Sequence, residues 1–161
     1  MGEFLLRAVL IGAGATALLD LWNILLNRTL GLPLPNWGMI GRWFCHLPSG
    51  KLAHESIGNS PGFSYELPAG WVAHYAVGIL FAMALMVIWP SWAKAPTLLP
   101  ALIVGWVTIL CGWLILAPGM GAGIAASKTP NPARARLMNL AGHTVFGIGL
   151  WGTALLTRGW F

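Results

Sequence analysis

Four stretches of about 20 mostly apolar residues limit what this chain can fold into. They cover residues 4–26, 67–89, 97–117 and 137–157. A helix of that length crosses the hydrocarbon core of a bilayer, which is about 30 Å thick. The stretches are too long and too little alternating for barrel strands, and lipid leaves no unpaired backbone polar group satisfied. The sequence therefore predicts an all-α fold, an integral membrane four-helix bundle that forms a single domain over residues 1–161.

The composition agrees with a membrane location. Hydrophobic residues make up 57% of the 161 residues and charged residues only 8%, with a mean hydropathy of +0.73. A soluble domain would need more charge to cover its surface. The net charge of +5 comes from cations scattered singly along the chain, which excludes a nucleic-acid-binding stripe. Cys45 and Cys111 stand far apart in different surroundings, so we expect two free thiols.

The connections between the stretches differ in length. Residues 90–96 form a tight turn, whereas residues 28–66 and 118–136 are long and polar or rich in glycine and proline. Because spans alternate in direction, both long connections should emerge on one side, where we expect function. The first contains Trp37, Trp43 and Phe44 among basic residues, which predicts an interfacial loop or short helix over the bundle mouth. Six of the nine Lys and Arg residues lie in these two connections, which favours a cytoplasmic side.

Three of the four stretches carry polar or small residues at helical spacing, so that each presents one polar stripe. Lipid penalises such groups, and the stripes should therefore face one another inside the bundle. The stripes are Thr16, Asp20, Asn23 and Asn27 in the first stretch, Glu66, Gly70, His74 and Gly78 in the second, and Arg136, Asn139, His143 and Gly147 in the fourth.

The depth of three of these side chains suggests a metal centre. Counting from the ends next to the long connections, Asp20, His74 and His143 each lie roughly 10 Å into the membrane. One carboxylate and two imidazoles form a ligand set for zinc or non-haem iron with open positions. Asn23 and Asn139 would orient these ligands from one turn away, and Glu66 would act as a base or gate at the mouth. The substrate would be a lipid or another amphiphile.

Two other functions remain open from the sequence, as does the question of whether the protein is an enzyme. His74 and His143 could be the axial ligands of a haem b, with Gly70, Gly78 and Gly147 leaving room for the macrocycle. The polar groups could also hold helices together in a scaffold or carrier without any ligand. A carrier built from four helices would need to form a homo-oligomer, for which Gly105 and Gly112 offer a contact surface.

The two long connections contain further candidate residues. Lys128, Arg134 and Arg136 follow a glycine-rich segment and are typical of binding to lipid head groups or another anion. The segment at 121–129 is not a phosphate-binding loop, because Ser127 replaces the glycine that must precede the lysine. His46, His54 and Glu55 are additional ligand candidates, although a histidine in a polar loop is more often simply solvated.

Several segments together resemble a known group of proteins. These are GAGATALLDLWN in the first stretch, FCHLPSGKLAHESI in the long connection, WVAHYAVGILFA in the second stretch and KTPNPARARLMNLAGHTVFGIGLW near the end. Over nearly the whole chain they are similar to an uncharacterised family of small bacterial inner-membrane proteins with four helices. The resemblance implies a multi-pass protein of the bacterial inner membrane. It implies no activity, cofactor or catalytic residue.

Overall fold

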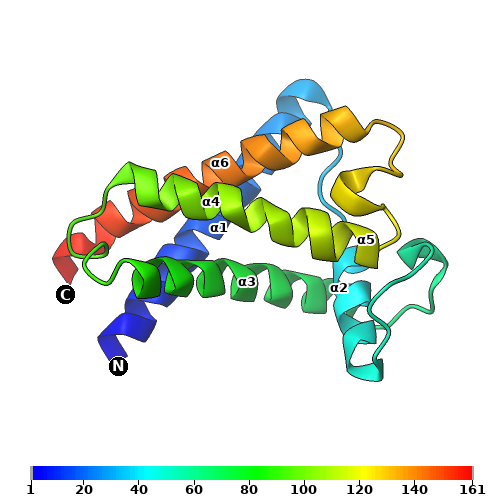
Figure 1. The fold of residues 1–161 in the computed structure, drawn as a ribbon, viewed down its shortest axis with the longest axis horizontal. Helices are drawn as coiled ribbons and strands as arrows, with labels where there is room; N and C mark the ends of the chain where they lie inside the picture. The colour runs from blue at the N-terminus through cyan, green and yellow to red at the C-terminus, as the bar shows by residue number, and fades with distance from the viewer. Residues whose placement is uncertain (1, 161) are drawn as a thin grey trace. The chain divides into compact units, whose positions relative to one another are not determined.

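The computed structural model describes residues 2–160, and within that range every regular element is helical (Figure 1). A π-helical turn at Gly112–Leu116 joins α4 to the short α5, so that Leu98–Gly119 is one continuous span. The helices are α1 Gly2–Leu30, α2 Trp37–His46, α3 Glu66–Ile88, α4 Leu98–Cys111, α5 Ala117–Gly119 and α6 Pro132–Thr157.

The four predicted apolar spans are confirmed as helices. By length and composition α1, α3, the span Leu98–Gly119 and the helix starting at Pro132 can each cross a membrane. The last helix begins five residues before the predicted position 137. Its start is set by capping, since Pro132 fixes a helical φ and the Asn131 side chain accepts a hydrogen bond from the Arg134 backbone N–H at 3.0 Å. The apolar content of the sequence does not predict a polar cap of this kind, so the predicted start was too late.

The short helix predicted in the first long connection is present as α2. The Asn36 side chain caps its first turn by accepting a hydrogen bond from the Met39 backbone N–H. After His46 the chain makes a 3-10 turn over Leu47–Ser49 and then reverses at Gly50, whose φ of 78° is readily adopted only by glycine. This reversal returns the chain alongside α2.

The contacts divide the chain into two compact units. The first unit contains residues up to Leu34, Tyr75–Thr108 and residues from Ala141 onward. The second unit contains Pro35–His74 and Ile109–Leu140, and therefore both long connections. The helices α3, α4 and α6 each contribute residues to both units.

Close helix packing holds the first unit together. Its core consists mainly of small and aliphatic residues, including Ala8, Ile11, Ala15, Leu85, Ala101, Phe146, Leu150 and Ala154. Gly12 packs so closely on α3 that a Cβ atom there would lie 2.5 Å from the Ile79 Cα atom. The turn between α3 and α4 lies at the same end of this unit as the start of α1 (Figure 1), and Arg7 donates a hydrogen bond to the Ala93 carbonyl there.

Hydrogen bonds between the two long connections hold the second unit together. The His54 backbone N–H donates to the Gly119 carbonyl at 3.0 Å, and the Ile57 N–H donates to the Met120 carbonyl at 3.1 Å. The connections therefore lie side by side, as the alternation of the spans predicts.

Candidate functional site

The first predicted metal ligand, Asp20, lies in the first unit and is half-buried on α1. Its carboxylate accepts a hydrogen bond from the Tyr75 hydroxyl at 3.0 Å. Tyr75 lies on α3, directly after His74. A carboxylate in an apolar helix needs hydrogen-bond donors, and the Tyr75 hydroxyl supplies one of them to Asp20.

The second predicted ligand, His143, also lies in the first unit. Its Nδ1 atom is 3.0 Å from the Gly105 carbonyl and 3.2 Å from the Thr108 hydroxyl, both on α4. A Cβ atom at Gly105 would lie 2.6 Å from the His143 carbonyl oxygen, so this glycine is a contact between α4 and α6. The suggestion that Gly105 serves an oligomer contact is therefore corrected, since the chain itself covers it.

The third predicted ligand, His74, belongs to the second unit. Its ring stacks on the Trp37 indole with centroids 3.9 Å apart and planes at 28°. Among residues 2–160, no three His, Cys, Asp or Glu side chains lie close enough together to hold a metal ion. The centre made of Asp20, His74 and His143 stays a prediction. Asn23 and Asn139, expected to orient those ligands, are half-buried.

Glu66, predicted as a base or gate, is engaged in a two-pronged ion pair. The Arg42 guanidinium donates to its two carboxylate oxygens at 2.8 and 2.9 Å, and the Phe63 backbone N–H donates to one of them at 3.1 Å. A carboxylate held in this way is stabilised in its ionised form, and it ties the start of α3 to α2. Its role as a base or gate stays a prediction.

Arg42 also ties down the end of the first long connection. Its Nη1 atom donates to the carbonyls of Ile57, Gly58 and Ser60 at 3.2–3.4 Å. The hydrogen bond to Glu66 raises the pKa of Arg42 above its ordinary value, so the guanidinium stays charged at every relevant pH. One side chain of α2 thus fixes both the start of α3 and the segment 57–60.

The predicted anion-binding cations lie on the surface of the second unit. Lys128, Arg134 and Arg136 are all exposed. Arg136 donates through Nε to the Ala125 carbonyl at 2.9 Å, which links the start of α6 to the preceding turn. Ala125 and Ala126 adopt positive φ values of 50° and 60°, a region that residues other than glycine rarely occupy.

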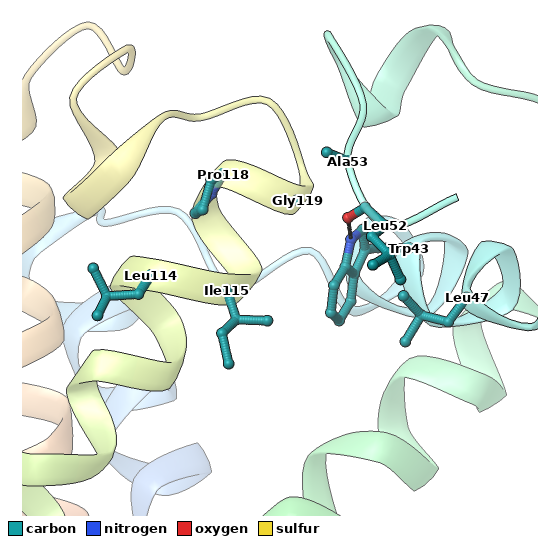
Figure 2. A pocket seen from close by; sticks show the side chains of 8 residues that line it. All are labelled: Trp43, Leu47, Leu52, Ala53, Leu114, Ile115, Pro118 and Gly119. Atoms are coloured by element: carbon teal, nitrogen blue, oxygen red, sulfur yellow. Dashed lines mark hydrogen bonds between the residues drawn. The ribbon is translucent and has the colours of Figure 1, made fainter. Parts of the chain in front are cut away.

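A pocket of about 430 Å³ opens in the second unit, between residues 43–53 of the first long connection and residues 114–119 at the end of the span Leu98–Gly119 (Figure 2). Leu114 and Ile115 form one side and Trp43 with Leu47 the other. The Trp43 Nε1–H donates to the Leu52 carbonyl at 3.0 Å, so the indole presents its apolar surface without an unpaired donor. The complete lining is Trp43, Leu47, Leu52, Ala53, Leu114, Ile115, Pro118 and Gly119.

The structure also brings together His46 and His54, two ligand candidates of the first long connection. Their ring centroids are 4.9 Å apart, and both residues are buried, with 8% and 7% of their surface exposed. The Nε2 atom of His54 is buried without a hydrogen-bond partner among the described residues. The sequence feature that could have predicted this pairing is Gly50, which lies between the two histidines. A glycine after Leu-Pro-Ser is typical of a chain reversal, which would bring the two residues close together.

Comparison with known proteins yields one match. Neither the curated proteins nor the solved structures contain a match to this chain. A family model described as a protein of unknown function (DUF2938) matches residues 9–157, which includes most of the first and last spans, the whole of the other two, both long connections and the pocket. The chain therefore belongs to the DUF2938 family.

Proposed function

We propose that this protein binds an anionic membrane amphiphile, with its hydrocarbon tail in the pocket of the second unit. The observation that carries the proposal is the pocket itself, which has a mostly apolar lining and a volume of about 430 Å³. Small-molecule sites typically have volumes of about 300–1,000 Å³ and mostly apolar walls. The pocket is therefore large enough and apolar enough to hold part of a hydrocarbon tail.

The source of the tail follows from the helices that form the pocket. Leu114 and Ile115 belong to the span Leu98–Gly119, and their exposed fractions are 55% and 57%. Side chains of this kind on a membrane-spanning helix face lipid. A tail can therefore enter the pocket from the bilayer without crossing water. This route favours a membrane lipid over a water-soluble ligand.

The charge of the second unit favours an anionic head group. Four exposed cations, Lys51, Lys128, Arg134 and Arg136, stand against one exposed acid, Glu55. Glu66 does not count against them, because it is paired with Arg42. Each Lys or Arg near a membrane surface contributes about 1 kcal/mol of attraction to anionic lipid. Lys51, one of these exposed cations, directly precedes the lining residue Leu52 in the chain.

The test is to fill the pocket from an exposed position. Ala53 lines the pocket and is exposed, so Ala53→Trp adds bulk without removing a core contact. Ala133→Trp is the matched control, an exposed alanine of the same unit outside the lining. Native mass spectrometry of protein in mild detergent should show bound phosphatidylglycerol for the wild type and Ala133→Trp, and a loss of at least tenfold for Ala53→Trp. Equal retention by all three proteins would overturn the proposal.

A second measurement separates the tail from the head group. Lys51→Gln combined with Lys128→Gln should weaken binding of phosphatidylglycerol while leaving binding of phosphatidylcholine unchanged. If both lipids lose affinity equally, the cations do not read the head group and the anionic part of the proposal is wrong.

A further inference from the structure

We infer that His46 and His54 form a two-histidine site for a late first-row divalent metal ion such as Zn²⁺. The site differs from the centre that the helical stripes predicted, and it does not depend on lipid binding. It rests on the burial of the two rings, their separation, the partners of their ring nitrogens and one unpaired lone pair.

The partners of the ring nitrogens fix which atoms are available. His46 Nε2 lies 3.1 Å from the Pro61 carbonyl, and His54 Nδ1 lies 3.1 Å from the Gly119 carbonyl. A carbonyl oxygen only accepts hydrogen bonds, so each of these nitrogens carries the proton. In the neutral rings, His46 Nδ1 and His54 Nε2 then hold the lone pairs. A backbone carbonyl that holds the N–H of an imidazole is the usual support of a metal-ligating histidine.

The unpaired atom points to a missing partner. His54 Nε2 is buried and has no hydrogen-bond partner among residues 2–160, and His54 as a whole is only 7% exposed. A buried polar atom without a partner costs free energy, and such atoms are rare in folded proteins. Coordination to a metal ion satisfies a lone pair of this kind.

The separation of the rings fits a shared ion. Two imidazoles bound to one tetrahedral Zn²⁺ at metal–nitrogen distances of about 2.0–2.1 Å have ring centroids about 5 Å apart. The centroids of His46 and His54 are 4.9 Å apart, with the planes tilted at 56°. The Phe63 ring packs edge-on against His46 with centroids 5.0 Å apart and shields that ring from water.

The ligand set defines the kind of ion and its reactivity. No third His, Cys, Asp or Glu completes the site within the described part of the chain, so water or an external ligand takes the remaining positions. Two imidazoles without carboxylates select Zn²⁺, Cu²⁺ or Ni²⁺ over Mg²⁺ and Ca²⁺. The site is therefore open, as catalytic rather than structural zinc sites are.

The experiment uses the full chain in mild detergent, without a polyhistidine tag and stripped with a chelator. Titration with ZnCl₂ should show one ion per chain by calorimetry and a rise in melting temperature, whereas MgCl₂ should produce neither. His46→Gln and His54→Gln should each lower the Zn²⁺ affinity at least tenfold. His74→Gln and His143→Gln remove the same number of imidazoles elsewhere and should leave the affinity unchanged.

The outcomes separate this site from the one predicted by the helical stripes. Loss of binding in His74→Gln and His143→Gln, with retention in His46→Gln and His54→Gln, would overturn the inference, as would the absence of binding by the wild type. X-ray absorption at the zinc edge keeps the test valid if a variant fails to fold. The wild-type spectrum should show two imidazole ligands, and a spectrum with none or with sulfur ligands contradicts the site.

Discussion

The two units of this protein are stabilised in different ways. In the first unit, glycines let helix backbones approach closely, as at Gly12 against Ile79 and at Gly149 against Ala15. In the second unit, side chains bind loop carbonyls, as Arg42 does at 57–60 and Trp43 at Leu52. The two buried side-chain nitrogens without partners among residues 2–160, His54 Nε2 and Trp113 Nε1, both lie in the second unit. Close backbone contacts between helices therefore characterise the first unit, and side-chain hydrogen bonds to loop carbonyls characterise the second.

The largest expected effect is the loss of stability when one buried side chain of the second unit, that of Trp43, is removed. Trp43 is 6% exposed, and Trp43→Ala should lower the free energy of unfolding by about 3–5 kcal/mol, because it removes a buried indole and leaves a cavity. Equilibrium unfolding in detergent measures this change, and Trp160→Ala, at an exposed position, should change it little. Equal losses in the two variants would mean that α2 is not held by the indole.

The next effect tests the glycine contacts of the first unit. A Cβ atom at Gly149 would lie 2.8 Å from the Ala15 Cα atom, so Gly149→Ala should cost about 1–3 kcal/mol through overpacking. Gly152, three residues further along α6, has no atom within 4 Å of an added Cβ, and Gly152→Ala should be neutral or slightly stabilising. The same unfolding measurement applies, and the comparison of the units fails if both substitutions behave alike.

A smaller and local effect should follow from loss of the Arg42 contacts. Arg42→Gln removes the ion pair with Glu66 and the bonds to the carbonyls of Ile57, Gly58 and Ser60. Hydrogen exchange of amides in residues 57–60 should accelerate at least tenfold, while the core amides of α1 stay protected. Arg42→Lys should restore little, because an ammonium group cannot make the two-pronged pair. Acceleration in α1 would instead show that the units open together.

The smallest expected effect is a change in the pH dependence of alkylation at the Cys45 thiol. Burial, with the nearby Glu66 charge, raises the pKa of the Cys45 thiol, so the thiol stays protonated to higher pH in the folded protein than in the unfolded chain. Any stability that this difference contributes is present at low pH and is lost as pH rises through the folded pKa. In a Cys111→Ser background, alkylation by iodoacetamide should reach half its maximal rate at higher pH in folded than in denatured protein. A lower midpoint in the folded protein would contradict this electrostatic description.

The sequence predicted the four spans because each needs only length and apolar content, which are local properties. It also predicted that polar residues such as Thr16 face protein, and Thr16 is 1% exposed. It did not predict the hydrogen bond from the Tyr75 hydroxyl to Asp20, because Tyr75 lies outside the polar stripe of the second stretch. The pairing of His46 with His54 depends on a reversal at Gly50 and on the Gly119 carbonyl, 65 residues away from His54. Contacts between residues so far apart in the chain produce no periodic pattern in the sequence from which they could be predicted.

The π-helical turn at Gly112–Leu116 decides where in the span Leu98–Gly119 a change of chain length can be absorbed. A π turn is equivalent to one extra residue inserted into an α-helix. The wider turn absorbs that residue, so deleting one residue from it would restore regular helix and leave the following side chains in phase with Ile109–Cys111. Deleting one residue from the regular helix Leu98–Cys111 would instead rotate all that follows by about 100° relative to the residues before it. Pro118 and Gly119 would then leave the pocket wall, and the Gly119 carbonyl would leave His54. A single lost codon, with hydropathy almost unchanged, would therefore erase both proposed sites in a chain that still inserts as four spans.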